Sequence, residues 1–217
     1  MMPPMFNTIL GLVMLISSVT KPVSTGPTNV VIATRSFSME NRYAVKYVND
    51  VFKDNILLTL AYMDGVVKTK NDISWDKVTS PFTYKFSLEP GQQFAFHDQL
   101  LPKYKGDLVK TTNAHFNYSD GFKSDGYLMG DGVCHLASII YWAAKDAGLT
   151  AVSPSNHNFA VIPEVPKEYG VAIYAMPGDL NTSGMQNLYI TNSLDKPVDF
   201  VFNYDGTNLR VSVTKTV

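Results

Sequence analysis

Short apolar runs that alternate with polar positions dominate the second half of the chain, a pattern typical of β-strands. Leu188–Thr191, Val198–Tyr204 and Leu209–Val213 carry this pattern, and Asp205-Gly206 supplies a hairpin turn between the last two runs. These segments predict a C-terminal β meander. The other runs for which we expect strands are Val30–Ser38, Phe82–Phe86, Phe94–Phe96, Phe159–Ile162 and Val171–Met176.

Two segments follow a helical period instead. In Gly130–Leu149, apolar residues such as Leu136 and Ile140 fall on one face, and glycines flank the run. Asn41–Met63 carries a second apolar stripe of helical spacing, for which we expect a break near Asp54-Asn55.

The order of these elements predicts an α+β fold. We expect a mixed or antiparallel sheet packed on a few helices, with one helix starting at a glycine-flanked cysteine and a β meander at the C-terminus. Residues 30–217 are expected to form this single domain. The polar stretch Leu100–Asp125 predicts a long functional loop, whose aromatics Phe116, Tyr118 and Phe122 are expected to be exposed.

Residues 1–29 are expected to form a signal peptide or an N-terminal membrane anchor followed by a linker. Residues 1–20 carry no charged side chain, and Phe6–Ile16 has the length of a signal-peptide core, shorter than the roughly 20 residues of a membrane span. The alternative is a buried N-terminal helix. Export predicts a protein that is secreted or anchored to the outer face of the cytoplasmic membrane, touching the membrane only through this segment.

Composition excludes several classes of function. The formal net charge is −1, which gives no electrostatic footprint for nucleic acid. No nucleotide-binding glycine motif and no spaced set of His, Cys and Asp is present, so neither a cofactor nor a metal is expected. The chain has one cysteine, which excludes an intramolecular disulfide.

That cysteine, Cys134, is the best candidate for chemistry. It lies in the run GDGVCHLAS, in the first turn of the predicted helix, where unpaired N–H groups and the helix dipole favour a thiolate. Backbone N–H groups of this turn could form an oxyanion site. The residues expected to line the substrate and oxyanion site are Gly130, Asp131, Gly132, Ser138 and Tyr141.

A thiol nucleophile needs a base, and His157 is the candidate because it follows the helix as in papain-like and transglutaminase-like enzymes. Asn187 or Asn192 would orient its imidazole. His97 and His115 lie in or near the predicted loop, and we expect them to be ordinary surface residues. The alternative is that Cys134 is structural, since a free cysteine often packs as a small hydrophobe.

The same residues carry a family resemblance. Gly130–Leu149 resembles the cysteine motif of VanW-like proteins, and Leu88–Phe96 and Asn187–Asn192 resemble flanking motifs of that family in the right order. The resemblance implies a bacterial-envelope protein linked to vancomycin resistance, with no established activity. The chain departs from the family pattern at five positions. His135 replaces a Gln, Asp131 a Gly and Ala137 a Ser. Gly170 and Asn187 each replace an Asp.

Two functions remain open at this point. The first is a non-catalytic envelope module that binds peptidoglycan or an envelope protein. The second is a cysteine-dependent hydrolase or transferase acting on acyl or amide bonds of envelope material. The sequence leaves open whether the protein is an enzyme, and it does not determine the oligomeric state.

Overall fold

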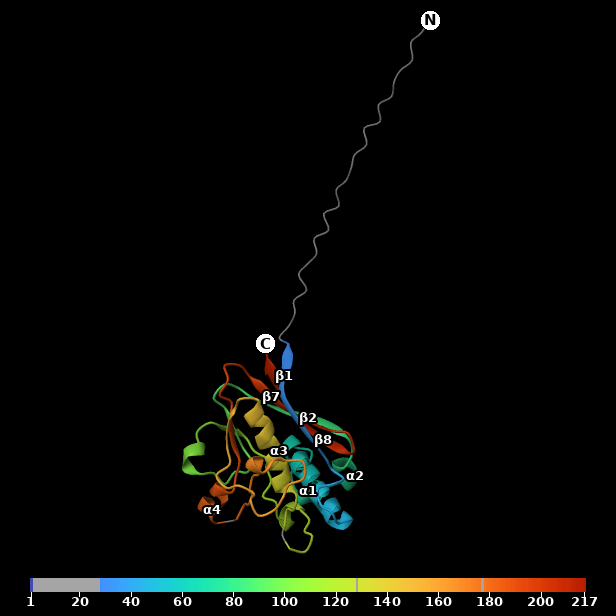
Figure 1. Cartoon of the computed structure of the whole chain (residues 1–217), viewed down its shortest axis with the longest axis vertical. Helices are drawn as coiled ribbons and strands as arrows, with labels where there is room; N and C mark the ends of the chain where they lie inside the picture. Colours follow the sequence, from blue (N-terminus) through green and yellow to red (C-terminus); the bar gives the residue numbers. More distant parts are fainter. Residues whose placement is uncertain (2–27, 128, 177) are drawn as a thin grey trace.

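Two four-stranded sheets organise the fold, which confirms the predicted α+β class (Figure 1). The computed structural model describes residues 1, 28–127, 129–176 and 178–217. The elements in chain order are β1 (Asn29–Ser38), α1 (Lys46–Asp64), α2 (Trp75–Val78), β2 (Phe82–Leu88), β3 (Gln93–Ala95), β4 (Leu108–Lys110), α3 (Val133–Asp146), β5 (Thr150–Val152), α4 (Leu180–Met185), β6 (Tyr189–Thr191), β7 (Val198–Tyr204) and β8 (Asn208–Thr216). Short 3₁₀ turns lie at Lys70–Asp72, Pro102–Tyr104, Tyr118–Asp120 and Lys167–Tyr169.

The first sheet is antiparallel, in the order β1-β8-β7-β2. Its last two strands in sequence form the predicted hairpin, whose turn is closed when Asp205 accepts hydrogen bonds from the N–H groups of Thr207 and Asn208. The first and last described residues of this sheet region also meet, because Thr28 and Val217 exchange two backbone hydrogen bonds. Both ends of the domain therefore lie together at one end of the sheet (Figure 1).

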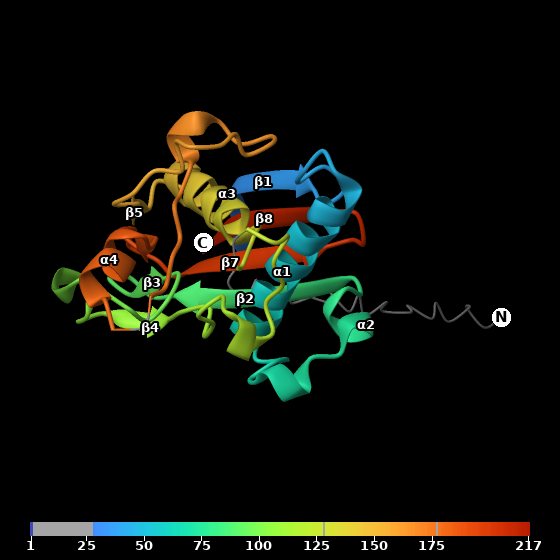
Figure 2. The same ribbon diagram turned by 90° about the horizontal axis from the view of Figure 1, so that it is seen from below.

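The second sheet has the order β4-β3-β6-β5 and lies beside α4 (Figure 2). Its strands have three residues each, and β3 pairs with β6 in antiparallel and with β4 in parallel orientation. The predicted mixed character of the fold comes from this parallel pair.

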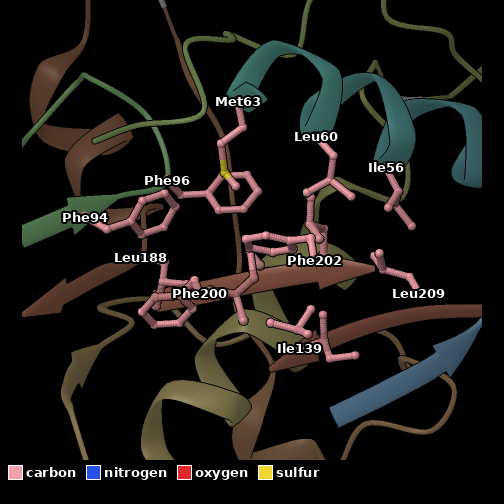
Figure 3. Close-up of a cluster of buried hydrophobic side chains, with 14 of the residues drawn as sticks. Ile56, Leu60, Met63, Phe94, Phe96, Ile139, Leu188, Phe200, Phe202 and Leu209 are labelled. Atoms are coloured by element: carbon pink, nitrogen blue, oxygen red, sulfur yellow. The ribbon is translucent and has the colours of Figure 1, made fainter. Parts of the chain in front are cut away.

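Helices α1 and α3 cover one face of the first sheet and also touch each other (Figure 2). Between the helices and the sheet, Ile56, Leu60 and Met63 of α1 meet Phe200 and Phe202 of β7 (Figure 3). All five side chains are almost fully buried, and burial of each stabilises the fold by roughly 1.5–3 kcal/mol. This shared core fixes the position of the N-terminal end of α3 relative to α1.

The expected break in the first helix is wrong, because α1 runs without interruption through Asp54 and Asn55. Asn55 is fully buried, and its amide binds the carbonyls of Lys123 and Asp131 while its oxygen accepts the N–H of Lys123. Asn has a low helix propensity, but here its side chain makes tertiary hydrogen bonds that the local sequence does not reveal. It ties α1 to the loop that leads into α3.

Two predicted strands are absent from the described residues. Phe159–Ile162 and Val171–Met176 are irregular, since neither segment pairs with a strand. Val171 and Ile173 contact α3 through hydrogen bonds with Ser138 and Cys134, whereas Phe159 and Val161 are exposed. β4, β5, α2 and α4 are too short to leave a period in the sequence, and none of them was predicted.

The long loop Leu100–Asp125 contains β4 and two 3₁₀ turns. Tyr118 is exposed as expected, at 70% of its surface, but Phe116 and Phe122 are buried. The expectation for these two is wrong because their rings pack edge to face and join the main core. These two rings therefore do not form the exposed surface that the binding hypothesis assigned to them.

The expected signal peptide or anchor lies almost entirely in residues 2–27, outside the described part of the chain. Within the described part, no helix has both the length and the apolar character needed to span a bilayer.

Candidate functional site

The N-terminal end of α3 is built on close backbone contacts rather than on an open glycine loop. Gly132 caps the helix with φ of 93°, and a Cβ atom there would lie 2.6 Å from the carbonyl oxygen of Phe52 in α1. Gly130 has φ of 79° and faces the carbonyl of Phe116 in the same way. These glycines are needed because they let the loop pack closely against the backbone of its neighbours.

A cavity of about 450 Å³ opens at this end of α3. We call it the α3 cavity. Gly130, Asp131 and Gly132, predicted to form the oxyanion site, all line it, together with both members of the predicted thiol–base pair. Aromatic side chains form its rim. The lining residues used below are Arg42, Tyr43, Phe52, Tyr127, Met129, Asp131, Cys134, His135, His157, Phe159, Ile173 and Tyr174.

The sulfur of Cys134 is held by the segment that covers α3. The backbone N–H of Ile173 donates to Sγ at 3.4 Å, and the thiol points back to the carbonyl of Ile173 at 3.8 Å. The side chain keeps partial exposure to the cavity. Burial nevertheless raises the pKa of the thiol to about 11, against the smaller lowering effect of the Ile173 N–H. Desolvation therefore outweighs the helix-start effect expected from the sequence.

Ser138 lies one turn after Cys134 and is fully buried. Its hydroxyl donates to the carbonyl of Cys134 at 2.7 Å and accepts the N–H of Val171 at 2.9 Å. Tyr141, one turn further, packs against Tyr169 and is not among the residues that line the cavity. The polar face of α3 thus binds the segment Val171–Ile173. Only the first turn of α3 reaches the cavity.

His135 is buried, with 5% of its surface exposed, and its ring lies edge-on to Phe52 with 5.1 Å between centroids. Its Nδ1 has no hydrogen-bond partner among the described residues. Burial, together with the nearby charge of Arg42, lowers the pKa of His135 to about 3. The imidazole is therefore neutral at physiological pH, and its enclosed Nδ1 is unpaired among the described residues.

His157 lies across from His135, with 6.3 Å between the ring centroids. Its Nδ1 is 3.2 Å from the carbonyl oxygen of Ala160, which can only accept, so Nδ1 carries the proton. Burial lowers the pKa of His157. Both His157 and Cys134 line the α3 cavity, but no hydrogen bond joins them in the described structure.

Asp131 also lines the cavity, and one of its carboxylate oxygens accepts the N–H of Asp125 at 3.1 Å. Burial and the neighbouring charge of Asp125 raise the pKa of Asp131 to about 6, although the Asp125 N–H opposes the shift. The carboxyl group is thus more easily neutralised than an ordinary aspartate, in keeping with the apolar surroundings.

Asn187 has partners other than His157. Its amide nitrogen donates to the carbonyl of His97 at 3.0 Å, and its oxygen accepts the N–H groups of His97 and Leu188. His97 is fully buried, so the expectation that it is an ordinary surface residue is wrong. Burial lowers the pKa of His97 to about 4. The Asn187–His97 pair joins the start of β6 to the chain after β3. Asn192, the other candidate orienter, binds the carbonyls of Leu88 and Lys196.

Gly170, where the VanW-like pattern has an Asp, was not assigned to the candidate site from the sequence. A Cβ atom placed on Gly170 would lie 3.3 Å from Cβ of His157. A side chain at this position would therefore stand next to the candidate base, on the element that follows the Lys167–Tyr169 turn.

A protein-family comparison matches residues 78–214, more than half of the chain, to the VanW like protein family. The chain belongs to the VanW-like family. This family is associated with vancomycin resistance, and its activity is not established. The matched region contains Cys134, His157 and Gly170, so the three positions examined above lie inside the part of the chain that is common to VanW-like proteins. No curated protein and no solved structure matches the chain.

Proposed function

We propose that this VanW-like protein is a non-catalytic binding module of the cell envelope, and that the α3 cavity is its binding site. The observation that carries the proposal is the state of Cys134. A thiol whose pKa is raised to about 11, and whose sulfur is already bound by Ile173, is almost wholly protonated at neutral pH. Since the thiolate is the nucleophile, this group is a poor one.

The surroundings of His157 support the same reading. Where the VanW-like pattern has an Asp, this chain has Gly170, and the missing side chain would stand beside His157. A thiol enzyme needs its base oriented and its imidazolium stabilised by a third polar group. Here the hydrogen bond of His157 goes to the carbonyl of Ala160, which holds the ring but carries no charge.

The rim of the cavity favours binding. Tyr43, Tyr127, Phe159 and Tyr174 all line the α3 cavity, and between 45% and 92% of each side chain is exposed. Exposed aromatic side chains around a concave, mainly apolar site are a common feature of ligand-binding surfaces. Envelope material, either peptidoglycan or an envelope protein, is the partner class that the proposal assigns, with the protein exported and held at or near the outer face of the membrane.

Co-sedimentation with purified peptidoglycan tests the proposal. The full chain is expected to pellet with the cell-wall fraction, and the double variant Tyr127→Ala/Phe159→Ala is expected to stay in solution. Cys134→Ser should pellet as the parent protein does. Leu180→Ala removes another exposed apolar side chain, 56% exposed and outside the cavity, and is the matched control. Equal pelleting of the double variant and the control would overturn the assignment of the cavity.

The second candidate, a cysteine-dependent hydrolase or transferase, is favoured by one observation: Cys134 and His157 line the same cavity. Its test is release of soluble fragments from purified envelope material. A loss of release in Cys134→Ser, with cell-wall binding intact, would establish the enzyme and reject the non-catalytic reading.

A further inference from the structure

We infer that the occupant of the α3 cavity is an uncharged linear glycan that continues past Met129 into a second hollow on the other side of that residue. This inference deepens the proposed function and depends on it. We call the second hollow the α1 groove. It has a volume of about 540 Å³, and the lining residues used here are Tyr47, Asp54, Lys70, Trp75, Tyr118 and Met129.

The two hollows share a wall residue. Met129 lines both of them, and it pairs with Ser124 in an isolated antiparallel β-bridge. α1 and the turn before it contribute to both as well, with Tyr43 and Phe52 in the α3 cavity and Tyr47 in the α1 groove. A ligand longer than the α3 cavity therefore meets a second concave surface at once, without leaving the protein.

Charge distinguishes a glycan from an acidic peptide. Arg42 in the α3 cavity is buried and paired with Glu164, and Lys123 in the groove is paired with Asp54. Lys70 donates to the carbonyl of Tyr118 and lies 3.5 Å from the centroid of the Tyr118 ring. The cations of both hollows are thus already engaged, and a ligand carboxylate would find none without displacing such a contact.

Aromatic rings also line the groove. Tyr47 and Tyr118 are 64% and 70% exposed, and the ammonium of Lys70 lies over the Tyr118 ring. A cation on one face of a ring holds the ring in place. Trp75 has Lys123 over its ring and packs against the core, so Tyr47 and Tyr118 are the rings suited to the C–H groups of a pyranose, which form an apolar surface without charge.

His135 adds the polar requirement. Its imidazole is neutral and borders the α3 cavity, while Nδ1 is enclosed by the protein and has no partner among the described residues. A hydroxyl or acetamido group can both donate and accept, so a sugar at the cavity wall suits a neutral imidazole in either tautomer. Aromatic platforms, engaged cations and one neutral polar group together fit an uncharged sugar chain.

Isothermal titration of the full chain with β-1,4-linked N-acetylglucosamine oligomers of two to six units tests the inference. We expect the dimer to bind and the hexamer to bind about tenfold more tightly, because the additional units reach two further rings. Tyr47→Ala/Tyr118→Ala should bring the hexamer back to the affinity of the dimer and leave the dimer unchanged. An anionic hexamer of galacturonic acid should bind more weakly than the uncharged hexamer.

The outcomes separate the two proposals. Affinity that is independent of length, or a hexamer affinity unaffected by Tyr47→Ala/Tyr118→Ala, overturns the continuation into the α1 groove. Tighter binding of the anionic hexamer overturns the uncharged ligand class. Cavity-dependent binding to peptidoglycan without binding of any N-acetylglucosamine oligomer rejects the glycan while the binding module stands. Loss of both rejects the module as well. Leu180→Ala is again the control.

Discussion

The backbone N–H of Ile173 donates a hydrogen bond to the Sγ atom of Cys134, with 3.4 Å between the two atoms. The contact lies between the first turn of α3 and a segment 39 positions further along the chain. It makes the sulfur part of the packing that closes the polar face of the helix. The reactivity of Cys134 is therefore set by this segment as well as by the helix.

The first prediction concerns that reactivity. With its pKa raised to about 11, Cys134 should react with iodoacetamide more slowly at pH 7 than free cysteine does, and the rate should continue to rise up to about pH 11. A rate profile measured by mass spectrometry between pH 6 and 11 checks this. A plateau reached below pH 8 would show a thiolate and would revive the enzyme hypothesis.

The second prediction concerns the position beside His157. Gly170→Asp places a carboxylate next to the imidazole and should raise the pKa of His157, whose burial now lowers it, by about one unit or more. Titration of the His157 ring protons by NMR measures the shift. Gly170→Asn is the matched control, because it has the same shape without the charge. Equal pKa values in the two variants would mean that the side chain points away from His157.

The third prediction tests the contact between α1 and α3. Gly132→Ala should destabilise the protein by about 3 kcal/mol or more, because the methyl group would meet the carbonyl of Phe52 in addition to the strain of a positive φ. Gly65→Ala, at a positive φ with open space around it, should cost only about 1–2 kcal/mol. Urea unfolding of both variants gives the comparison. Similar losses would show that backbone strain alone requires Gly132.

The fourth prediction is a dependence of stability on pH. The pKa of His135 is about 3 in the folded protein and about 6.5 when unfolded, so the unfolded chain binds the extra proton between these values. The free energy of unfolding should fall as the pH drops below 6.5, by up to about 1.4 kcal/mol per pH unit from this residue. Above pH 6.5 the residue makes no such difference.

His135→Gln removes this dependence and should give a shallower loss of stability between pH 6.5 and 4. Urea midpoints at several pH values measure it. The remaining slope combines His97 and His157, whose pKa values are lowered as well, with the opposing contribution of Asp131, whose pKa is raised. An unchanged slope in His135→Gln would mean that the ring is hydrated in the folded state.

The strands and helices that carry the core could be predicted because burial imposes a period on them. Val198–Tyr204 was predicted with the bounds of β7, since its alternate residues face the core. The helix at Gly130–Leu149 was found for the same reason. Val171–Met176 misled, because Val171, Ala172 and Ala175 are buried although the segment does not pair as a strand, and burial alone does not distinguish these cases.

The site was predictable only in part. The sequence indicated the thiol, the glycines and His157 as neighbours, and all of them line the α3 cavity. It could not show that Ile173 binds the sulfur or that Asn187 pairs with His97, because both contacts depend on the tertiary fold. The direction of the pKa shift at Cys134 depended on the same missing information, namely how much of the helix end is shielded from water.

The backbone pair between Thr28 and Val217 brings both ends of the domain to one pole. The Tyr118–Asp120 turn, whose Tyr118 lines the α1 groove, lies at the opposite pole (Figure 1). A molecule tethered through its first strand would therefore hold this turn away from the attachment surface. For the same reason, a reporter fused after Val217 would lie far from Tyr118.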